Sequence, residues 1–327
     1  MNESCLAPRL RIAIATGDPG GIGPEISIKA ALDPAVRAIC DPVLIGDRGA
    51  LERHASTCGL SIESISVVDR KQLEAGELRI GEVQAAHGRA ALDSAQAAIR
   101  GALAGEYEAV VAAPHTEAAI RAAGYEFDGY PSFVARTAGL APDEGILMLC
   151  FAYQGREVRI AHVTLHASVA ACLKLITTDR VLRTIRAVDA ALRNIGVEQP
   201  RIAVSGVNPH AGEGGLFGDE EEKLVTPAID AARRWGVAAE GPIGADTLIQ
   251  RPGYDAYVVM LHDQGHVAAK LLAPNGAAAL TIGTPVLFSS VAHGSALDIA
   301  GQGKAGHRAM VEAITRLVGR RRRAQAT

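Results

Sequence analysis

Apolar runs alternate with segments of helical periodicity along most of the chain, and this alternation predicts an α/β fold. An apolar, β-branched run at residues 10–15 leads into a glycine-rich turn, and Pro24 and Glu25 then occupy the positions of a first helical turn. The same order recurs, with further strands predicted at 41–47 and 107–114 and helices at 92–105 and 117–125.

The middle of the chain predicts an antiparallel element within a mixed sheet. In residues 146–166 a Tyr-Gln-Gly turn separates two apolar runs too closely for a helical crossover. Helices are predicted next at 181–196 and 220–236, and a strand at 254–262 that runs up to His262. Several of these strands end in polar clusters, where open α/β sheets bind their ligands.

The organisation favours two α/β domains that share one cleft. No Pro-, Ser- or charge-rich linker divides the chain, so we expect it to cross between the domains more than once. The expected larger domain comprises residues 1–132 plus 268–327 and carries a nucleotide-binding loop. The expected second domain, residues 133–267, carries the metal ligands and the dimer interface.

Composition and charge narrow the class of partner. The 327 residues are 48% hydrophobic, which is ample for buried cores, and the net charge of −3 gives no electrostatic case for binding nucleic acid. No segment has the run of about 18 apolar residues that spans a membrane. Five scattered cysteines without a C-x-x-C spacing are typical of reduced thiols. We therefore expect a cytoplasmic protein that binds a small molecule.

Three histidines, His166, His210 and His262, stand at the ends of predicted strands and are candidate metal ligands. Three imidazoles with an open fourth position describe a catalytic rather than a structural metal site. His266 raises the alternative of a helical two-histidine site, but such sites have Glu after the first histidine, and here Asp263 follows. Because the strand is predicted to reach His262, the pair is expected to straddle a strand end and a turn.

Two glycine-rich loops have both structural and ligand-binding interpretations. The stretch GDPGGIGPE, residues 17–25, lacks the Gly-Lys-Ser/Thr ending of a P-loop, so a tight turn is favoured over a nucleotide site. In the stretch HGSALDIAG, residues 293–301, backbone amides and Asp298 suit a nucleotide ribose, and a surface loop is the equal alternative on composition alone.

These motifs occur in an order that resembles the 4-hydroxythreonine-4-phosphate dehydrogenase family of vitamin B6 biosynthesis. The resemblance is carried by GDPGGIGPE, NPHAGEGGLFGDEE, GPIGADT, HDQGH with Lys270, and HGSALDIAG. It implies a homodimer of two-domain subunits similar to isocitrate and isopropylmalate dehydrogenases, with the active site in the interdomain cleft. It also implies a divalent metal and NAD(P), used to oxidise a hydroxy acid that then loses CO2.

Carried over position by position, the resemblance implies roles for individual residues. His166, His210 and His262 would bind the metal, with the site completed across the dimer interface, and His266 matches no family ligand. Zinc is the first candidate, with Mg, Mn, Co or Fe as alternatives. Lys270 would contact the substrate, and Asp246 and Asp263 would line the same catalytic pocket, with Lys270 the first candidate for moving a proton and Asp246 the second. The expected nucleotide loop comprises His293, Gly294, Ser295, Ala296 and Asp298, and Asp298 would favour NAD over NADP.

Departures from the family pattern point to a changed substrate. Tyr130 and Pro131, followed by Ser132, replace a His-Thr pair that binds substrate, while Ala279 replaces an Asn and Phe288 an Arg. Each lost charge-assisted hydrogen bond is worth roughly 1.5–3 kcal/mol, so a phosphate would bind poorly. The stretches PHTEAAI, GYPS, MLHDQGH and KLLAPNGAAAL resemble the branch that oxidises the cis-dihydrodiol of terephthalate to protocatechuate.

Three other functions stay open. The protein could oxidise 4-hydroxythreonine 4-phosphate or a related phosphorylated sugar acid with the same metal and NAD. A metal-dependent hydrolase would use the histidines but leave HGSALDIAG without a role. A binding protein without catalysis is disfavoured because all three ligand histidines and Lys270 are present.

Overall fold

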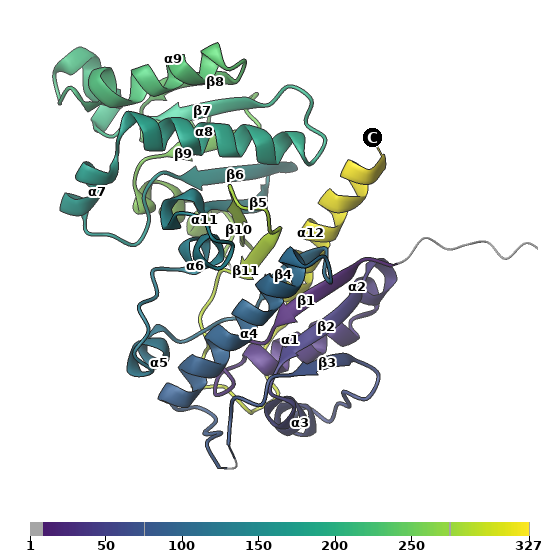
Figure 1. Ribbon diagram of the computed structural model, residues 1–327. Helices are drawn as coiled ribbons and strands as arrows, with labels where there is room; N and C mark the ends of the chain where they lie inside the picture. Colours follow the sequence, from purple (N-terminus) through teal and green to yellow (C-terminus); the bar gives the residue numbers. More distant parts are fainter. Residues whose placement is uncertain (1–8, 75, 275, 327) are drawn as a thin grey trace, which may run out of the picture. The chain divides into compact units, whose positions relative to one another are not determined.

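The apolar run near the N-terminus forms the central strand of a parallel sheet in the computed structural model, which describes residues 9–74, 76–274 and 276–326 (Figure 1). This first unit has the strand order β3-β2-β1-β4-β11, with all pairs parallel. Helix α4 packs against β1, β2 and β4, and α1 packs against β2 and α3. Its elements are β1 (Arg11–Ala15), α1 (Gly23–Leu32), α2 (Pro34–Ile39), β2 (Asp41–Gly46), α3 (Arg48–Thr57), β3 (Ser66–Asp69), α4 (Ala85–Leu103), β4 (Ala109–Ala112), α5 (Glu117–Ala122), β11 (Phe288–Val291) and the start of α12 (Arg308–Ala326).

The second unit has a mixed sheet with the strand order β10-β5-β6-β9-β7-β8. Its strands are β5 (Ile146–Tyr153), β6 (Arg156–His162), β7 (Arg201–Ser205), β8 (Ala238–Ile243), β9 (Ala256–Val259) and β10 (Ala278–Ile282). Its helices are α6 (Tyr130–Thr137), η1 (Pro142–Glu144), α7 (Val169–Leu175), α8 (Thr178–Arg193), η2 (Pro209–Gly215), η3 (Glu221–Val225), α9 (Thr226–Arg234), α10 (Ala245–Leu248) and α11 (His262–Leu272).

The predicted antiparallel element is confirmed. Strand β5 pairs antiparallel with β6 through the tight turn at Gln154 and Gly155, and it also pairs antiparallel with β10. Gln154 and Gly155 have φ values of 48° and 75°, which is the left-handed conformation that two-residue hairpin turns require. The strand pairs β6–β9, β7–β9 and β7–β8 of this unit are parallel. The α/β class and its mixed sheet therefore agree with the sequence pattern.

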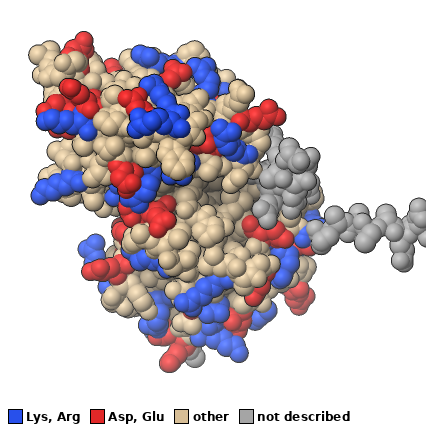
Figure 2. Space-filling model, turned by 45° about the horizontal axis from the view of Figure 1, so that its top comes forward, with Lys and Arg blue, Asp and Glu red and all other residues tan. Residues whose placement is uncertain are grey.

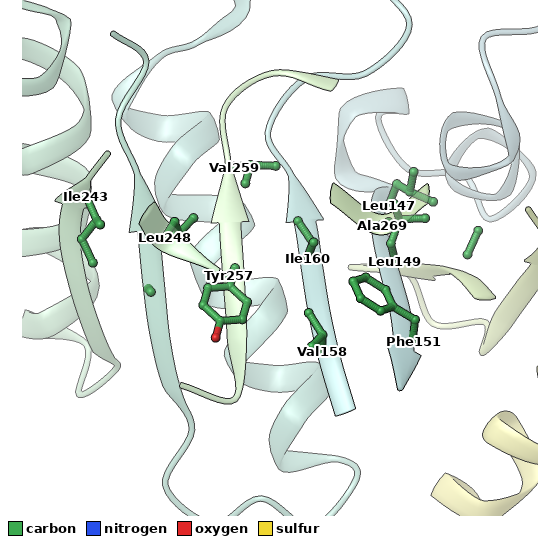
Figure 3. Close-up of a cluster of buried hydrophobic side chains, with 12 residues drawn as sticks. Leu147, Leu149, Phe151, Val158, Ile160, Ile243, Leu248, Tyr257, Val259 and Ala269 are labelled. Atoms are coloured by element: carbon green, nitrogen blue, oxygen red, sulfur yellow. The ribbon is translucent and has the colours of Figure 1, made fainter. Parts of the chain in front are cut away.

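Both faces of the second sheet are covered by helices. On one face, Leu248 of α10 and Ala269 of α11 pack over Tyr257, Ile160 and Phe151 of the central strands (Figure 3). Alternate strand residues, among them Ile202 and Val258, are also fully buried, and α8 contacts the same strands. A parallel strand buried on both faces has no polar side to mark it, which explains the continuous apolar runs in the sequence.

The division between the units differs from the expected boundaries. One unit comprises the chain up to Phe127 with Val286–Gly319, and the other comprises Asp128–Pro285 with the last residues of α12. The sequence had placed the two boundaries between the domains after residue 132 and before residue 268. The segment after α11 belongs to the second unit because β10 pairs with β5 through five residue pairs.

One sequence-based boundary is wrong in a way that affects the site. The strand predicted at 254–262 ends at Val259, and His262 is the first residue of helix α11. Met260 and Leu261 form the connection. His262 and His266 therefore lie one turn apart on a single helix rather than across a strand end and a turn.

Two further expectations concern the surroundings of the protein. Over residues 9–74, 76–274 and 276–326, no helix has the length and apolar character needed to cross a bilayer. None of the four cysteines in those ranges is in a disulfide bond, and Cys5 lies outside them. On the face drawn in Figure 2, acidic and basic side chains are interspersed and neither sign forms a continuous patch.

Candidate active site

The first turn of α11 orients His262 for binding at one ring nitrogen. Its Nδ1 lies 2.7 Å from the Oδ1 of Asp263, which accepts the Nδ1 hydrogen. In the tautomer that donates from Nδ1, the lone pair lies at Nε2. Metal-binding histidines are commonly fixed by a carboxylate in this way, which sets the tautomer and the ring orientation. Asp263, expected to be a pocket residue, thus also positions His262.

His166 lies in the loop after β6 and meets His262. Its Nδ1 is 3.2 Å from the carbonyl oxygen of Asp128, an arrangement that again leaves Nε2 available. Gly129 makes this approach possible, because its φ is 109° and an added Cβ would lie 3.2 Å from the His166 Nδ1. The ring centroids of His166 and His262 are 5.7 Å apart. Two of the three expected metal ligands therefore come together within this unit.

His266 stacks on His262. The ring centroids are 3.8 Å apart and the planes differ by 8°. The Nδ1 of His266 lies 3.2 Å from the His262 carbonyl oxygen, so the preceding turn of the helix holds the ring. Burial, and secondarily the neighbouring His262, lowers the pKa of His266 to about 4. His266 is consequently a neutral imidazole near pH 7.

A fourth histidine, His162, completes this cluster and was not identified from the sequence. It ends strand β6, is 2% exposed, and its ring centroid lies 4.7 Å from that of His266. Neither ring nitrogen has a hydrogen-bond partner among the described residues. Burial, and secondarily the neighbouring His266, lowers the pKa of His162 to about 3. One signal was available in the sequence: His162 is in phase with the buried Ile160.

Gly265 makes room for the buried ring. A Cβ at this position would lie 2.3 Å from the Nε2 of His162, so only glycine allows α11 to pack this closely on β6. The glycine of the HDQGH stretch is thus explained by a neighbour far away in sequence.

Gly265→Ala should lower the free energy of unfolding by about 1–3 kcal/mol, because the added methyl overpacks the contact with His162. The cost should be much smaller when His162 is also changed to alanine, since the clashing ring is then absent. Gly49→Ala in α3 is the matched control, because nothing lies within 4 Å of its added Cβ. This substitution should raise the free energy of unfolding by up to about 1 kcal/mol. Urea unfolding of the single and double variants measures these differences. Additive costs for Gly265 and His162 would contradict the packing argument.

Gln264 holds the connection between β9 and α11 in place. Its Oε1 accepts hydrogen bonds from the backbone nitrogens of Met260 and Leu261 at 2.8 and 3.0 Å. Its Nε2 donates to the carbonyl oxygen of Gly206 at 3.1 Å, beyond the end of β7. This side chain therefore fixes where His262 emerges from the sheet.

His210, the third expected ligand, lies elsewhere in the same unit. It begins a run of left-handed residues, His210 to Gly214, whose φ values are all positive. The buried carboxylate of Glu221 supports this loop by accepting hydrogen bonds from the backbone nitrogens of Val207 and Asn208, each at 2.7 Å. The His210 ring contacts Glu213 and Phe217. Within the part of the chain that the structure describes, no group of three His, Cys, Asp or Glu side chains is placed to hold one metal ion.

The expected catalytic residues lie around α11. Asp246 and Asp263 line one cavity of about 650 Å³. Asp246 also neighbours the His210 backbone, because a Cβ on Gly244 would lie 2.7 Å from the Asp246 Oδ1 and 3.4 Å from the His210 Cα. Lys270 is exposed on α11, four residues after His266, and its charge contributes to the lowered pKa of His266.

The expected substrate residues differ in their surroundings. Tyr130 and Pro131 are buried at the start of α6, and burial raises the pKa of Tyr130. Ser132 lines a second cavity, beside His166. Ala279 packs in the same apolar cluster as Leu248 and Tyr257. Phe288 is fully buried in the first unit.

The glycine loop of the first unit serves packing, as its sequence favoured. Gly17 has a φ of 70°, and an added Cβ at Gly21 would lie 2.7 Å from the Ser295 Cβ. The Ile22 nitrogen donates to the Ser295 carbonyl oxygen at 2.9 Å, which ties the stretch 293–301 to this turn. Within that stretch Ala296 has a φ of 40° and Asp298 is exposed. The glycine turn therefore holds in place the loop that contains the expected cofactor residues His293, Gly294, Ser295, Ala296 and Asp298.

Comparison with known proteins identifies the family. The fold is similar to that of a solved β-decarboxylating dehydrogenase from Thermococcus kodakarensis, with a TM-score of 0.51 at 17% identity, covering 95% of this chain and 81% of that chain. The family model described as "Pyridoxal phosphate biosynthetic protein PdxA" matches residues 38–317. The chain belongs to this family, as its sequence motifs indicated.

Two relatives within the family are dehydrogenases of different substrates. The 1,2-dihydroxy-3,5-cyclohexadiene-1,4-dicarboxylate dehydrogenase of Comamonas sp. is 44% identical over 311 residues, which covers 94% of this chain and 96% of the relative. The crystal structure of 4-hydroxythreonine-4-phosphate dehydrogenase from Klebsiella pneumoniae matches with a TM-score of 0.82 at 33% identity, covering 98% and 99% of the two chains. The oxidoreductase class is thereby supported.

Proposed function

We propose that this protein is an NAD-linked, divalent-metal-dependent dehydrogenase that converts 1,2-dihydroxy-3,5-cyclohexadiene-1,4-dicarboxylate to protocatechuate and CO2. The observation that carries the proposal is the 44% identity, over nearly the whole of both chains, with the Comamonas enzyme named for this substrate. Two hydrogens leave the diol as a hydride to NAD and a proton, and loss of one carboxylate as CO2 gives the aromatic ring.

The residues around α11 fit a metal-binding role in part. His166 and His262 each have Nδ1 engaged and Nε2 available, and their rings are 5.7 Å apart. His210 lies beside Asp246 instead. In our proposal His166, His210 and His262 hold the ion in a homodimer whose partner subunit completes the site. A bound divalent ion would acidify the substrate hydroxyl and stabilise the charge that develops as CO2 leaves.

The other residues supply orientation and proton transfer. Asp263 holds the His262 ring, and Lys270 takes the proton from the hydroxyl, with Asp246 as the second candidate. The loop at 293–301 receives NAD, and the Asp298 carboxylate binds the ribose hydroxyls. A 2′-phosphate at that position would meet a carboxylate, so NAD is preferred over NADP.

The substrate preference follows from the groups that the expected substrate residues lack. Tyr130, Pro131, Ala279 and Phe288 supply no cation for a phosphate, and all four are buried. The structural likeness to the Klebsiella enzyme makes 4-hydroxythreonine 4-phosphate the second candidate. Each missing charge-assisted contact is worth roughly 1.5–3 kcal/mol, so discrimination of about 100-fold or more is expected from two of them.

NADH formation, followed at saturating NAD with added divalent metal, tests the proposal. The dihydrodiol of terephthalate should give a kcat/KM about 100-fold or more above that for 4-hydroxythreonine 4-phosphate. A preference for the phosphorylated substrate would reject the substrate assignment while leaving the dehydrogenase class intact. Absence of NADH with both substrates, together with no NAD binding in a titration, would reject the class.

A further inference from the structure

A second cavity of the Asp128–Pro285 unit adjoins His166. Its volume is about 220 Å³, and its walls include Ile146, Leu165 and Leu175. Polar side chains of His166, Arg180 and Ser132 also reach it. A chamber that combines apolar walls with several polar groups suits a ring that carries a charged substituent.

The acidic side chains of this cavity are already neutralised. Asp143 pairs with the Nη2 of Arg183 at 2.6 Å, and this hydrogen bond lowers the pKa of Asp143. Asp128 pairs with Arg136. Both carboxylates keep these ion pairs, while the charge of Asp143 also acts on Arg180 at a longer distance.

Arg180, by contrast, has a guanidinium group without a paired carboxylate. Its Nε donates to the Val163 carbonyl oxygen at 2.7 Å, which fixes the plane of the group. Over the described residues, the two terminal amino groups have neither a hydrogen-bond nor an ion-pair partner. Burial lowers the pKa of Arg180. An anion entering the cavity would therefore meet a fixed, partly desolvated cation with free donors.

We propose that Arg180 binds the carboxylate of the substrate that is not lost in the reaction, and that this contact selects 1,4-dicarboxylates. The inference rests on the proposed function. A planar guanidinium binds a carboxylate through two parallel hydrogen bonds. One unpaired cation balances the single charge of a carboxylate, whereas a phosphate dianion beside Asp128 and Asp143 would retain excess negative charge.

The position of the cavity supports this orientation. His166 forms part of its wall, and the His166 ring lies 5.7 Å from that of His262. A substrate with its reacting end at these two histidines would direct its opposite end away from them. The apolar side chains of Leu165 and Ile146 then line the path that a flat six-membered ring requires.

Binding of non-reacting analogues tests the role of Arg180 without turnover. Isothermal titration of the metal-loaded protein with terephthalate and with benzoate compares two and one carboxylates on the same ring. The wild type should bind terephthalate about 10-fold or more tightly than benzoate, and Arg180→Met should reduce this ratio to near one. Arg180→Lys should give an intermediate ratio, because it keeps the charge but loses the bidentate geometry.

Arg186→Met is the matched control, because Arg186 lies on the same helix and instead covers the ring of Trp235 at 4.1 Å. It should keep the wild-type ratio. If Arg180→Met weakens both ligands equally, the residue is only structural and the inference fails. Competition with bound terephthalate gives a further test. If inorganic phosphate displaces terephthalate as effectively as benzoate does, the carboxylate assignment is also overturned.

The two proposals fail in different ways. Oxidation of the dihydrodiol by the wild type, combined with an unchanged terephthalate-to-benzoate ratio in Arg180→Met, would reject the role of Arg180 and retain the proposed function. In the other case, Arg180→Met reduces the terephthalate-to-benzoate affinity ratio to near one, but the wild type does not oxidise the dihydrodiol. That result would retain the dicarboxylate site and reject the proposed reaction.

Discussion

His262→Ala should reduce the affinity for a divalent metal ion by more than about 100-fold, whereas His266→Ala should leave the ion bound. His262 has its Nδ1 held by Asp263 at 2.7 Å and faces His166, so it is placed to give Nε2 to a metal. Loss of a supporting carboxylate alone typically costs about 10–100-fold. Asp263→Asn should therefore fall between wild type and His262→Ala.

Titration with Zn²⁺ and Mn²⁺, together with elemental analysis of the purified variants, measures these affinities. Thermal unfolding of each variant without metal serves as the control for folding. If His266→Ala loses the ion as completely as His262→Ala does, the stacked pair acts as two ligands and the assignment of His210 must be revised.

The second large effect is expected at Lys270. Lys270→Met should lower kcat by about 10²–10⁴-fold while metal and NAD still bind, because the group proposed to accept the hydroxyl proton is then absent. Lys270 follows His262 and His266 at intervals of four residues on α11, so the three side chains share a helix face. Its charge already acts on His266, and among the described residues it forms no ion pair.

Single-turnover NADH formation and metal titration separate the possible roles of this lysine. Lys270→Arg keeps the positive charge but cannot lose a proton near neutral pH, so it should not restore turnover. Lys174→Met, which removes an exposed lysine of α7, should leave kcat unchanged. Full activity in Lys270→Arg would reduce Lys270 to an electrostatic role and make Asp246 the candidate base.

The sheet and its helices were largely predictable because their signals are local. The strand at 10–15, the hairpin around Gln154 and the helix after residue 178 each follow from periodicity and turn residues within a short window. The boundary at His262 was not predictable in this way. Its apolar run continues to Leu261, but the Gln264 side chain binds the backbone of Met260 and Leu261 and the helix starts immediately afterwards.

The candidate site was likewise predictable only in part. Sequence motifs indicated His166 and His262 as neighbours in space, and the structure places their rings 5.7 Å apart. The buried His162 ring and the Arg180 guanidinium had no motif, because their roles depend on partners far along the chain.

The sequence by itself determined the α/β class, the family and the residue types that could bind a metal, since these follow from periodicity and from motifs of contiguous residues. Only the tertiary structure decided which side chains meet. Gly265 is needed because His162 from another strand occupies the space of its missing side chain. Likewise Arg180 is a candidate ligand only because Arg183 and Arg136 already pair with the nearby carboxylates. Such contacts are set by packing across the sheet, and no local pattern encodes them.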